Sequence, residues 1–257
     1  MKKKFFHTNS VGVITTILLL LITLLSLKEN DFLSEQLKNA RVRKAMAGKQ
    51  NTISELLKKH EIEKGKLNVL ITAFKEEGKL VLYGKNSGEK KYQLLKSYDI
   101  CASSGKAGPK RAAGDGQVPE GFYKIDRFNP WSNFYLSLGV SYPNKSDRIL
   151  CKGKSTGGDI FIHGNCVTIG CMPMTDDKIE EIYLLAVYAR NNGQLSIPVY
   201  IFPFEMNDTR YKAELAKIKD SDILKLWPAL KKGYDFFTTS NAEIPYSIND
   251  SGLYIIQ

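Results

Sequence analysis

The chain has 257 residues, of which 43% are hydrophobic and 25% charged, so it can bury one large core or two smaller ones. Its net charge of +10 favours anionic partners, such as anionic lipid or an acidic cell-wall polymer. The lysines are scattered and form no long basic run interleaved with aromatic residues, which argues against nucleic acid as a partner.

Residues 1–30 are predicted to form a signal or anchor segment. Lys2, Lys3 and Lys4 precede an uncharged apolar stretch over 11–27, and a positive start followed by such a stretch is typical of an export signal. Neither a small-residue cleavage site nor a lipid-bearing cysteine follows the stretch. We therefore expect an uncleaved anchor in the inner membrane, with the lysines on the cytoplasmic side and the remaining chain in the periplasm or cell envelope.

Residues 31–65 are polar, with apolar residues at helical spacing, and we expect a short helical lead-in or a solvated spacer. Asn51 or Thr52 is predicted to cap a second helix within this segment. Gly65 is predicted to end that helix.

The main domain, 66–257, begins where the apolar pattern changes to a period of two. Strands are predicted over 67–74, 79–84, 92–102, 122–128, 134–142, 157–164 and 197–204. A helix capped by Thr175 is predicted over 175–193, and one or two closing helices over 210–237, broken near Pro228. Strands and helices do not alternate regularly, so we expect a β-rich α+β domain with flanking helices rather than a doubly wound parallel sheet.

A glycine-rich segment over 103–121 separates the third predicted strand from the fourth. Its 19 residues include five glycines and two prolines. A loop of this length inside a compact domain is usually functional or disordered.

The segment IHGNCVTIGCMPM, residues 162–174, places His163 eight residues before Cys171. A cysteine nucleophile needs a base that makes the thiolate, and N–H groups that face the developing oxyanion. Gly164 permits a sharp turn after the strand that ends in His163, and Gly170 permits a carbonyl group to approach closely. The helix that follows places its positive end near the thiol. The pattern favours a cysteine–histidine catalytic pair.

Other interpretations of this segment stay open. A zinc site would need more ligands at short spacing, and the other two histidines are His7 and His60, so we expect no metal site. A disulfide between Cys166 and Cys171 would block the proposed nucleophile. The histidine and cysteines could also be ordinary buried residues.

The motif resembles the signature of the L,D-transpeptidase (YkuD-domain) family, in which His-Gly is followed by Ser/Thr-x-Gly-Cys. The matching residues are His163, Gly164, Thr168, Gly170 and Cys171. The segments GDGQVPEGFY, FNPWSNFYLSLGVSYPN and GCMPMTDDKIEEIY are similar to the YafK-like branch of that family. The resemblance covers about residues 66–205. It implies a β-rich catalytic fold that acts on peptidoglycan stem peptides without a cofactor.

The resemblance also implies a role for each residue of the motif. Cys171 is expected to attack an amide carbonyl and form a thioester, with His163 as the base and later the acid. The carbonyl group of Gly164 is expected to orient the imidazole. The N–H groups of Gly170 and Cys171 are expected to form the oxyanion hole, above a floor that includes Thr168.

One position departs from the family pattern. Pro173 stands two residues after the cysteine, where the broader family has an arginine associated with substrate binding. Met172 and Arg148 are therefore candidates for substrate binding, Arg148 as the partner of a substrate carboxylate. The glycine-rich segment supplies further cations, for which solvated loop side chains are the more ordinary interpretation: Lys106, Lys110 and Arg111.

The remaining cysteines are Cys101 and Cys151. Both can be simple core residues. Export to an oxidising compartment also allows a Cys101–Cys151 disulfide, and Cys166 could reversibly lock Cys171.

Several functions are compatible with these features. The first is an acyltransferase that cross-links stem peptides or attaches a wall lipoprotein. The second is a hydrolase of the same family that trims stem peptides or detaches a wall-linked protein. The third is a non-catalytic wall-binding module, and the fourth is a redox or metal protein.

Overall fold

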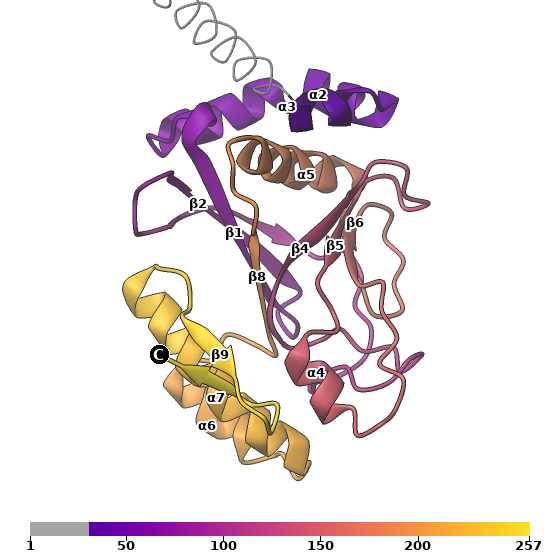
Figure 1. Ribbon diagram of the computed structural model, residues 1–257, viewed down its shortest axis with the longest axis vertical. Coiled ribbons are helices and arrows are strands. Elements are labelled where there is room, and N and C mark those ends of the chain that lie inside the picture. The colour runs from indigo at the N-terminus through magenta and orange to yellow at the C-terminus, as the bar shows by residue number, and fades with distance from the viewer. Residues whose placement is uncertain (1–30) are drawn as a thin grey trace, which may run out of the picture.

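A curled mixed sheet is the centre of the domain in the computed structural model, which describes residues 31–257 (Figure 1). Its strands are β1 (Leu67–Phe74), β2 (Lys79–Asn86), β3 (Gln93–Asp99), β4 (Gly121–Asn129), β5 (Ser137–Val140), β6 (Phe161–His163), β7 (Met172–Pro173) and β8 (Pro198–Phe202). They are ordered β3-β2-β1-β8-β4-β5-β6-β7. The pairs β1–β8 and β6–β7 are parallel, and the other neighbours are antiparallel. All seven predicted strands are present, and the predicted α+β class is confirmed.

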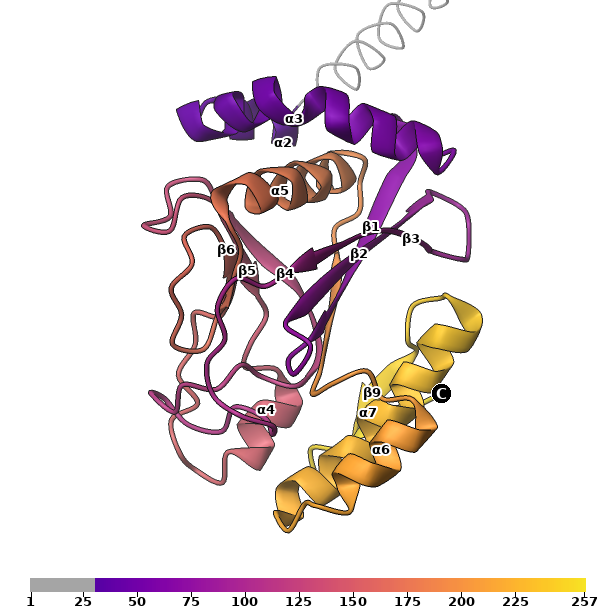
Figure 2. The ribbon, with the colours of Figure 1, turned by 180° about the vertical axis from the view of Figure 1, so that it is seen from behind.

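Helices flank the sheet (Figures 1 and 2). On one side lie α2 (Asp31–Leu37), α3 (Ala40–Lys59) and α5 (Asp176–Asn191), with the short 3-10 helix η1 (Lys64–Lys66) leading into β1. On the other side lie α6 (Asp208–Leu215), α7 (Ser221–Ser240) and a hairpin of β9 (Tyr246–Ile248) and β10 (Tyr254–Ile256) that the sequence pattern did not predict. The short helix α4 (Lys145–Leu150) lies between β5 and β6 in the chain.

The sheet carries a hydrophobic core on each face. Along β8, Val199 and Ile201 belong to the cluster that includes α5, whereas Tyr200 and Phe202 belong to the cluster that includes Trp227 of α7. Successive strand residues point to opposite faces, so a strand covered on both sides is apolar throughout. The apolar sequence of β8, and the mostly apolar sequence of β1, in which only Asn68 and Thr72 are polar, follow from this position.

The lead-in packs against α5 and is not a solvated spacer. Its helix α3 is capped by Asn39, whose side chain accepts a hydrogen bond from the N–H of Arg41, and it continues through Asn51 and Thr52. The predicted start at Asn51 or Thr52 is therefore wrong. Residues before and after that point share one buried stripe, and packing along it outweighs the modest helix propensity of asparagine and threonine. The buried residues are Val42, Ala45, Ile53 and Leu57.

The break between the closing helices lies at 216–220 and not near Pro228, as the sequence pattern predicts. Pro228 is inside α7, where its missing N–H removes one helical hydrogen bond. The neighbouring Trp227 is almost fully buried, and its indole N–H donates to Glu120 at 2.9 Å. These tertiary contacts hold the helix together across the proline.

Within residues 31–257, no helix is long and apolar enough to cross a membrane. The expected anchor over 11–27 lies outside the described residues. The anchor therefore stays a prediction from the sequence.

Candidate active site

Two neighbouring parallel strands bring His163 and Cys171 to one site. His163 is the last residue of β6, and Cys171 immediately precedes β7. In the register of these strands, Ile162 lies opposite Met172 and His163 lies opposite Pro173. Both motif residues line one cavity of about 530 Å³.

The backbone fixes the orientation of the His163 ring. Its Nδ1 lies 2.6 Å from the carbonyl oxygen of Gly164. A carbonyl oxygen can only accept, so Nδ1 carries the hydrogen and Nε2 of the neutral ring keeps its lone pair. The ring of Phe134 lies against the imidazole, with 4.7 Å between ring centroids. Burial lowers the pKa of His163 below its ordinary value of 6.5, and the ring is therefore neutral at pH 7.

The Cys171 thiol is also neutral at rest. Its Sγ lies 3.6 Å from the carbonyl oxygen of Asp159. Burial raises the pKa of the thiol above its ordinary value of 9.0, and a backbone hydrogen bond from Phe161 and the positive charge of Lys110 offset only part of this effect. The pair therefore rests as thiol and imidazole rather than as thiolate and imidazolium.

Thr168 organises the turn before the thiol. Its hydroxyl oxygen accepts from the N–H of Gly170 at 3.2 Å and from the N–H of Cys171 at 2.9 Å, and it donates to the Cys171 carbonyl oxygen at 2.8 Å. These are the two N–H groups that the motif predicts as oxyanion donors. In this structure they are already engaged, so they do not form an open oxyanion hole.

Gly170 is required by its conformation and by a close neighbour. Its φ of +132° is one that residues with a side chain rarely adopt. A Cβ atom there would lie 3.1 Å from the carbonyl oxygen of Gln117. Gln117 belongs to the glycine-rich segment, which therefore packs directly against the turn that carries the thiol.

The glycine-rich segment is ordered by Lys75, at the end of β1. The Lys75 ammonium group lies within hydrogen-bond distance of the Glu120 carboxylate, at 2.9 Å, and of three carbonyl oxygens of the segment, which share its three N–H donors. Glu120 is fully buried and also accepts from the N–H of Gly108 at 2.8 Å. Lys75 and Glu120 thus tie the start of the segment, near Gly108, to its end, near Val118. The carbonyl oxygens belong to Lys106, Gly108 and Val118.

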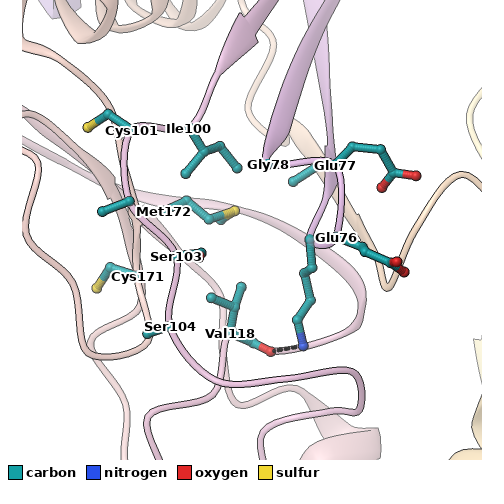
Figure 3. A pocket seen from close by; sticks show the side chains of 13 residues that line it. Glu76, Glu77, Gly78, Ile100, Cys101, Ser103, Ser104, Val118, Cys171 and Met172 are labelled. Carbon is teal, nitrogen blue, oxygen red and sulfur yellow. Dashed lines mark hydrogen bonds between the residues drawn. The ribbon is translucent and has the colours of Figure 1, made fainter.

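Cys171 also lines a second cavity, of about 290 Å³ (Figure 3). Its lining includes Ser103, Ser104 and Met172, but not His163. Met172, predicted to bind substrate, is almost fully buried and contributes to this lining. Cys171 therefore lines two cavities, and only one of them is also lined by His163.

Two predicted cations lie apart from Cys171. Arg148 is exposed on α4 and lines neither cavity, so the structure does not bring it to the site. Lys106 is exposed and lines a separate cavity with Lys217 and Lys219.

The other two cations of the glycine-rich segment are not solvated. Lys110 is only 5% exposed and forms an ion pair with Asp115 at 2.6 Å. Arg111 forms a 3.1 Å ion pair with the buried Asp147. The solvated interpretation is wrong for both, and Lys110 is the cation whose charge lowers the pKa of Cys171.

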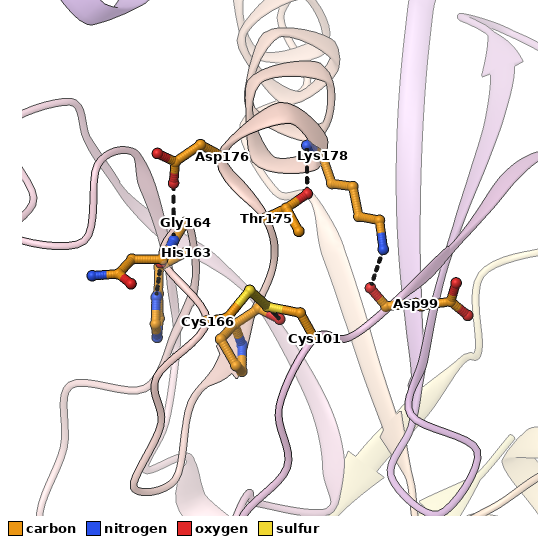
Figure 4. Close-up of a disulfide and its surroundings, with 10 residues drawn as sticks. Asp99, Cys101, His163, Gly164, Cys166, Thr175, Asp176 and Lys178 are labelled. Atoms are coloured by element: carbon orange, nitrogen blue, oxygen red, sulfur yellow. Dashed lines mark hydrogen bonds between the residues drawn. A yellow bond between two sulfur atoms is a disulfide. The ribbon is translucent and has the colours of Figure 1, made fainter.

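A disulfide joins Cys101 to Cys166 (Figure 4). Among residues 31–257, Cys151 and Cys171 are free thiols. The predicted Cys101–Cys151 pairing and the Cys166 lock on Cys171 are therefore both wrong. The Cys101 N–H donates to the Pro173 carbonyl oxygen at 3.0 Å, which places Cys101 beside the loop that contains Cys166. Zinc ligation by the motif is disfavoured too, since Cys166 is oxidised.

We expect the double variant Cys101→Ser/Cys166→Ser to lose about 4 kcal/mol of unfolding free energy, because the disulfide closes a long loop in the unfolded chain. The cysteines are separated by 65 residues. Urea unfolding with and without reductant measures the effect. Reductant should destabilise the wild type and leave the double variant unchanged. Equal stability of the two proteins under oxidising conditions would contradict the prediction.

In the part of the chain that the structure describes, no group of three or more histidine, cysteine, aspartate or glutamate residues is placed to hold a metal ion. The reactive groups of the site are one thiol and one imidazole, held by backbone groups and the Thr168 hydroxyl.

Some residues of the site are not predicted by the sequence motif. Asp159, Phe134 and Ser137 line the cavity with His163, and Cys101 braces the loop before the thiol. Only Ser137 carries a usable signal, since it is a polar residue between two leucines in a predicted strand. Phe134 and Cys101 are distant in sequence from the motif, and Asp159, although only four residues before His163, is not marked by the motif pattern.

The fold and the paired motif residues define a class of enzyme domain. Residues 68–201 match the model of the L,D-transpeptidase catalytic domain, YkuD, and the chain belongs to this family. It is 41% identical to YafK of Escherichia coli strain K12, a protein named as an L,D-transpeptidase, over 190 residues that cover 73% of each chain. The resemblance to this family and to its YafK-like branch is thereby confirmed.

Two solved structures resemble the chain at low similarity. The helical cell shape determining protein Pgp2 of Campylobacter jejuni is 18% identical, with a TM-score of 0.43 over 71% of this chain and 73% of that one. Bd1075 of Bdellovibrio bacteriovorus is 22% identical, with a TM-score of 0.37 over 66% and 62%. Family membership, rather than these structures, supports an enzyme that acts on peptidoglycan.

Proposed function

We propose that the protein is a cysteine-dependent acyltransferase that acts on peptidoglycan stem peptides through a thioester on Cys171. The observation that carries this proposal is the cavity shared by Cys171 and His163, with the His163 ring fixed through its Nδ1 by the Gly164 carbonyl group. A thiol and a base oriented by a backbone carbonyl group, both on one cavity, are the two groups that nucleophilic catalysis by cysteine requires.

In the first step, Cys171 Sγ attacks an amide carbonyl carbon while His163 Nε2 takes the thiol proton. The oxyanion can use the N–H groups of Gly170 and Cys171 only by sharing them with the Thr168 hydroxyl. Collapse breaks the C–N bond, and His163 returns the proton to the leaving amine. The product is a thioester and a free amine.

In the second step, an acceptor attacks the thioester, His163 takes its proton, and the proton returns to Cys171 Sγ. The leaving amine and the acceptor both need His163, so both should occupy the cavity that His163 lines. The retained acyl group then extends toward the other cavity, beside Met172. This division follows from using one acid–base group in both steps.

The acceptor decides the product. An amine of a second stem peptide gives a cross-link, and an amine of a wall lipoprotein gives attachment. Water gives hydrolysis, which is the second candidate function because Pro173 stands where the family's substrate-binding arginine is expected.

The proposed site of action is the periplasm or cell envelope, with residues 11–27 as the anchor in the inner membrane. The Cys101–Cys166 disulfide supports an exported location, because disulfides persist in oxidising compartments.

Incubation of the full-length protein with purified muropeptides, followed by mass spectrometry, tests the proposal. A larger product indicates transfer, and a smaller product indicates hydrolysis. Absence of both products, together with absence of an acyl adduct on Cys171, would contradict the enzyme interpretation.

We expect an unusual pH dependence for Cys171. Because burial raises the pKa of the thiol, alkylation by iodoacetamide should be slow at neutral pH and rise with a midpoint above 9.0. Because burial lowers the pKa of His163, the ring stays neutral to lower pH. The midpoint of the acid limb in the pH profile of kcat/KM should therefore lie below pH 6.5. Alkylation rates in a Cys151→Ser background report Cys171 alone. Fast alkylation persisting to about pH 5 would instead indicate a thiolate–imidazolium pair.

A further inference from the structure

Ser137 presents a buried hydroxyl group to the cavity that His163 lines. The residue is 2% exposed, and within residues 31–257 its Oγ has no hydrogen-bond partner. Ser137 also lines the cavity of about 530 Å³ together with His163 and Cys171. An unpaired buried hydroxyl is destabilising, so its position beside a cavity points to a partner supplied by a ligand.

The sheet register places Ser137 directly beside His163. Ser137 of β5 lies opposite His163 of β6 on one side and opposite Asn129 of β4 on the other. Residues directly opposite in antiparallel strands project from the same face, with Cβ atoms about 5 Å apart. The three side chains therefore form a polar row along one wall of the cavity.

The other two members of this row have defined hydrogen bonds. Asn129 Oδ1 accepts from the N–H of Trp131 at 3.1 Å. His163 uses Nδ1 for the Gly164 carbonyl group, which leaves Nε2 as an acceptor. Ser137 Oγ and His163 Nε2 are thus two neighbouring acceptors that face the same space.

We propose that Ser137 binds the incoming acceptor beside His163, an inference that rests on the proposed function. The attacking nitrogen of a neutral primary amine and the oxygen of a water molecule each carry two hydrogens and at least one lone pair. One hydrogen goes to His163 Nε2 and the other to Ser137 Oγ, which directs the lone pair at the thioester carbon. His163 then takes the first hydrogen as the new C–N or C–O bond forms and the C–S bond to Cys171 breaks.

This arrangement also predicts which acceptors are used. A secondary amine or an alcohol offers a single hydrogen and leaves Ser137 or His163 unpaired. The site should therefore favour primary amines and water over both of these classes.

The test separates the two half-reactions of the full-length protein. A stem-peptide aryl thioester acylates Cys171 without needing a protonated amine leaving group, and the burst of released thiol measures this step. Intact mass then follows decay of the acyl-enzyme in water and with glycinamide as the acceptor. In Ser137→Ala, the rate of the thiol burst should stay within about 2-fold of the wild-type rate. The acyl-enzyme should decay about 10-fold more slowly, both in water and with glycinamide, which is the rate effect expected from the loss of one hydrogen bond.

Two further variants control the result. Ser137→Thr keeps the hydroxyl and should recover most of the decay rate. Thr72→Val removes another fully buried strand hydroxyl that lines neither cavity, and it should leave both half-reactions unchanged. Equal slowing of both half-reactions in Ser137→Ala would show a merely structural role. An acyl-enzyme of Ser137→Ala that decays at the wild-type rate would also overturn the inference. Absence of an acyl adduct on wild-type Cys171 would instead overturn the proposed function itself.

Discussion

Replacing Cys171 by alanine is expected to reduce muropeptide turnover by at least about 10³-fold while leaving the fold intact. The proposed reaction has no thioester without the sulfur, and the remaining cavity can contribute only binding. The thiol donates one long hydrogen bond, at 3.6 Å to the Asp159 carbonyl oxygen, and receives a backbone hydrogen bond from Phe161, so its loss should change stability little. Activity and stability should therefore separate cleanly in this variant.

Cys151→Ala is the matched control for this prediction. Cys151 is the other free thiol among the described residues, is 7% exposed and lines neither cavity. Mass spectrometry of muropeptide products should show normal turnover for Cys151→Ala and none for Cys171→Ala. If Cys171→Ala retains function, the non-catalytic wall-binding module becomes the better interpretation.

The motif could be predicted from sequence because its parts are local. His163, Gly164, Thr168 and Cys171 lie within nine residues, and a strand, a tight turn and a second strand suffice to bring them together. The strands could also be predicted, because burial of one face of a sheet gives alternating apolar residues and burial of both faces gives an apolar run.

The wrong predictions concern contacts between distant segments. Sequence spacing alone does not determine which loops come into contact, so it allows a Cys101–Cys151 disulfide. In the structure, Cys101 follows β3, its N–H donates to the Pro173 carbonyl oxygen, and its sulfur is bonded to Cys166. Local propensity predicts a break at Pro228 because it does not include the packing of Trp227 against the domain. Tertiary contacts decide both outcomes.

The glycine-rich segment is the clearest case of such a long-range effect. Its composition is compatible with a disordered loop, yet the buried carboxylate of Glu120 holds it. That carboxylate accepts hydrogen bonds from Lys75, from the Gly108 N–H and from Trp227, which come from three separate parts of the chain. No local sequence pattern predicts that these three groups bind the same carboxylate.

Glu120→Ala is therefore expected to destabilise the protein by about 3–5 kcal/mol, because Lys75 would be left buried without its counter-charge. The Lys75 side chain is 10% exposed and that of Glu120 is 0% exposed, so water cannot replace the lost carboxylate. The Trp227 indole would lose its partner as well. Urea unfolding monitored by tryptophan fluorescence measures the loss.

Two comparisons identify the cause of this destabilisation. Glu214→Ala removes the surface pair with Lys217 and should lower the unfolding free energy by less than about 1 kcal/mol. The double variant Lys75→Met/Glu120→Leu removes both charges and should recover part of the stability, since the cost arises from the uncompensated ammonium group. A loss below about 1 kcal/mol in Glu120→Ala would show that water reaches the pair. Because Gln117 of the same segment packs against Gly170, a loosened segment should also slow acylation of Cys171 in the fraction that stays folded.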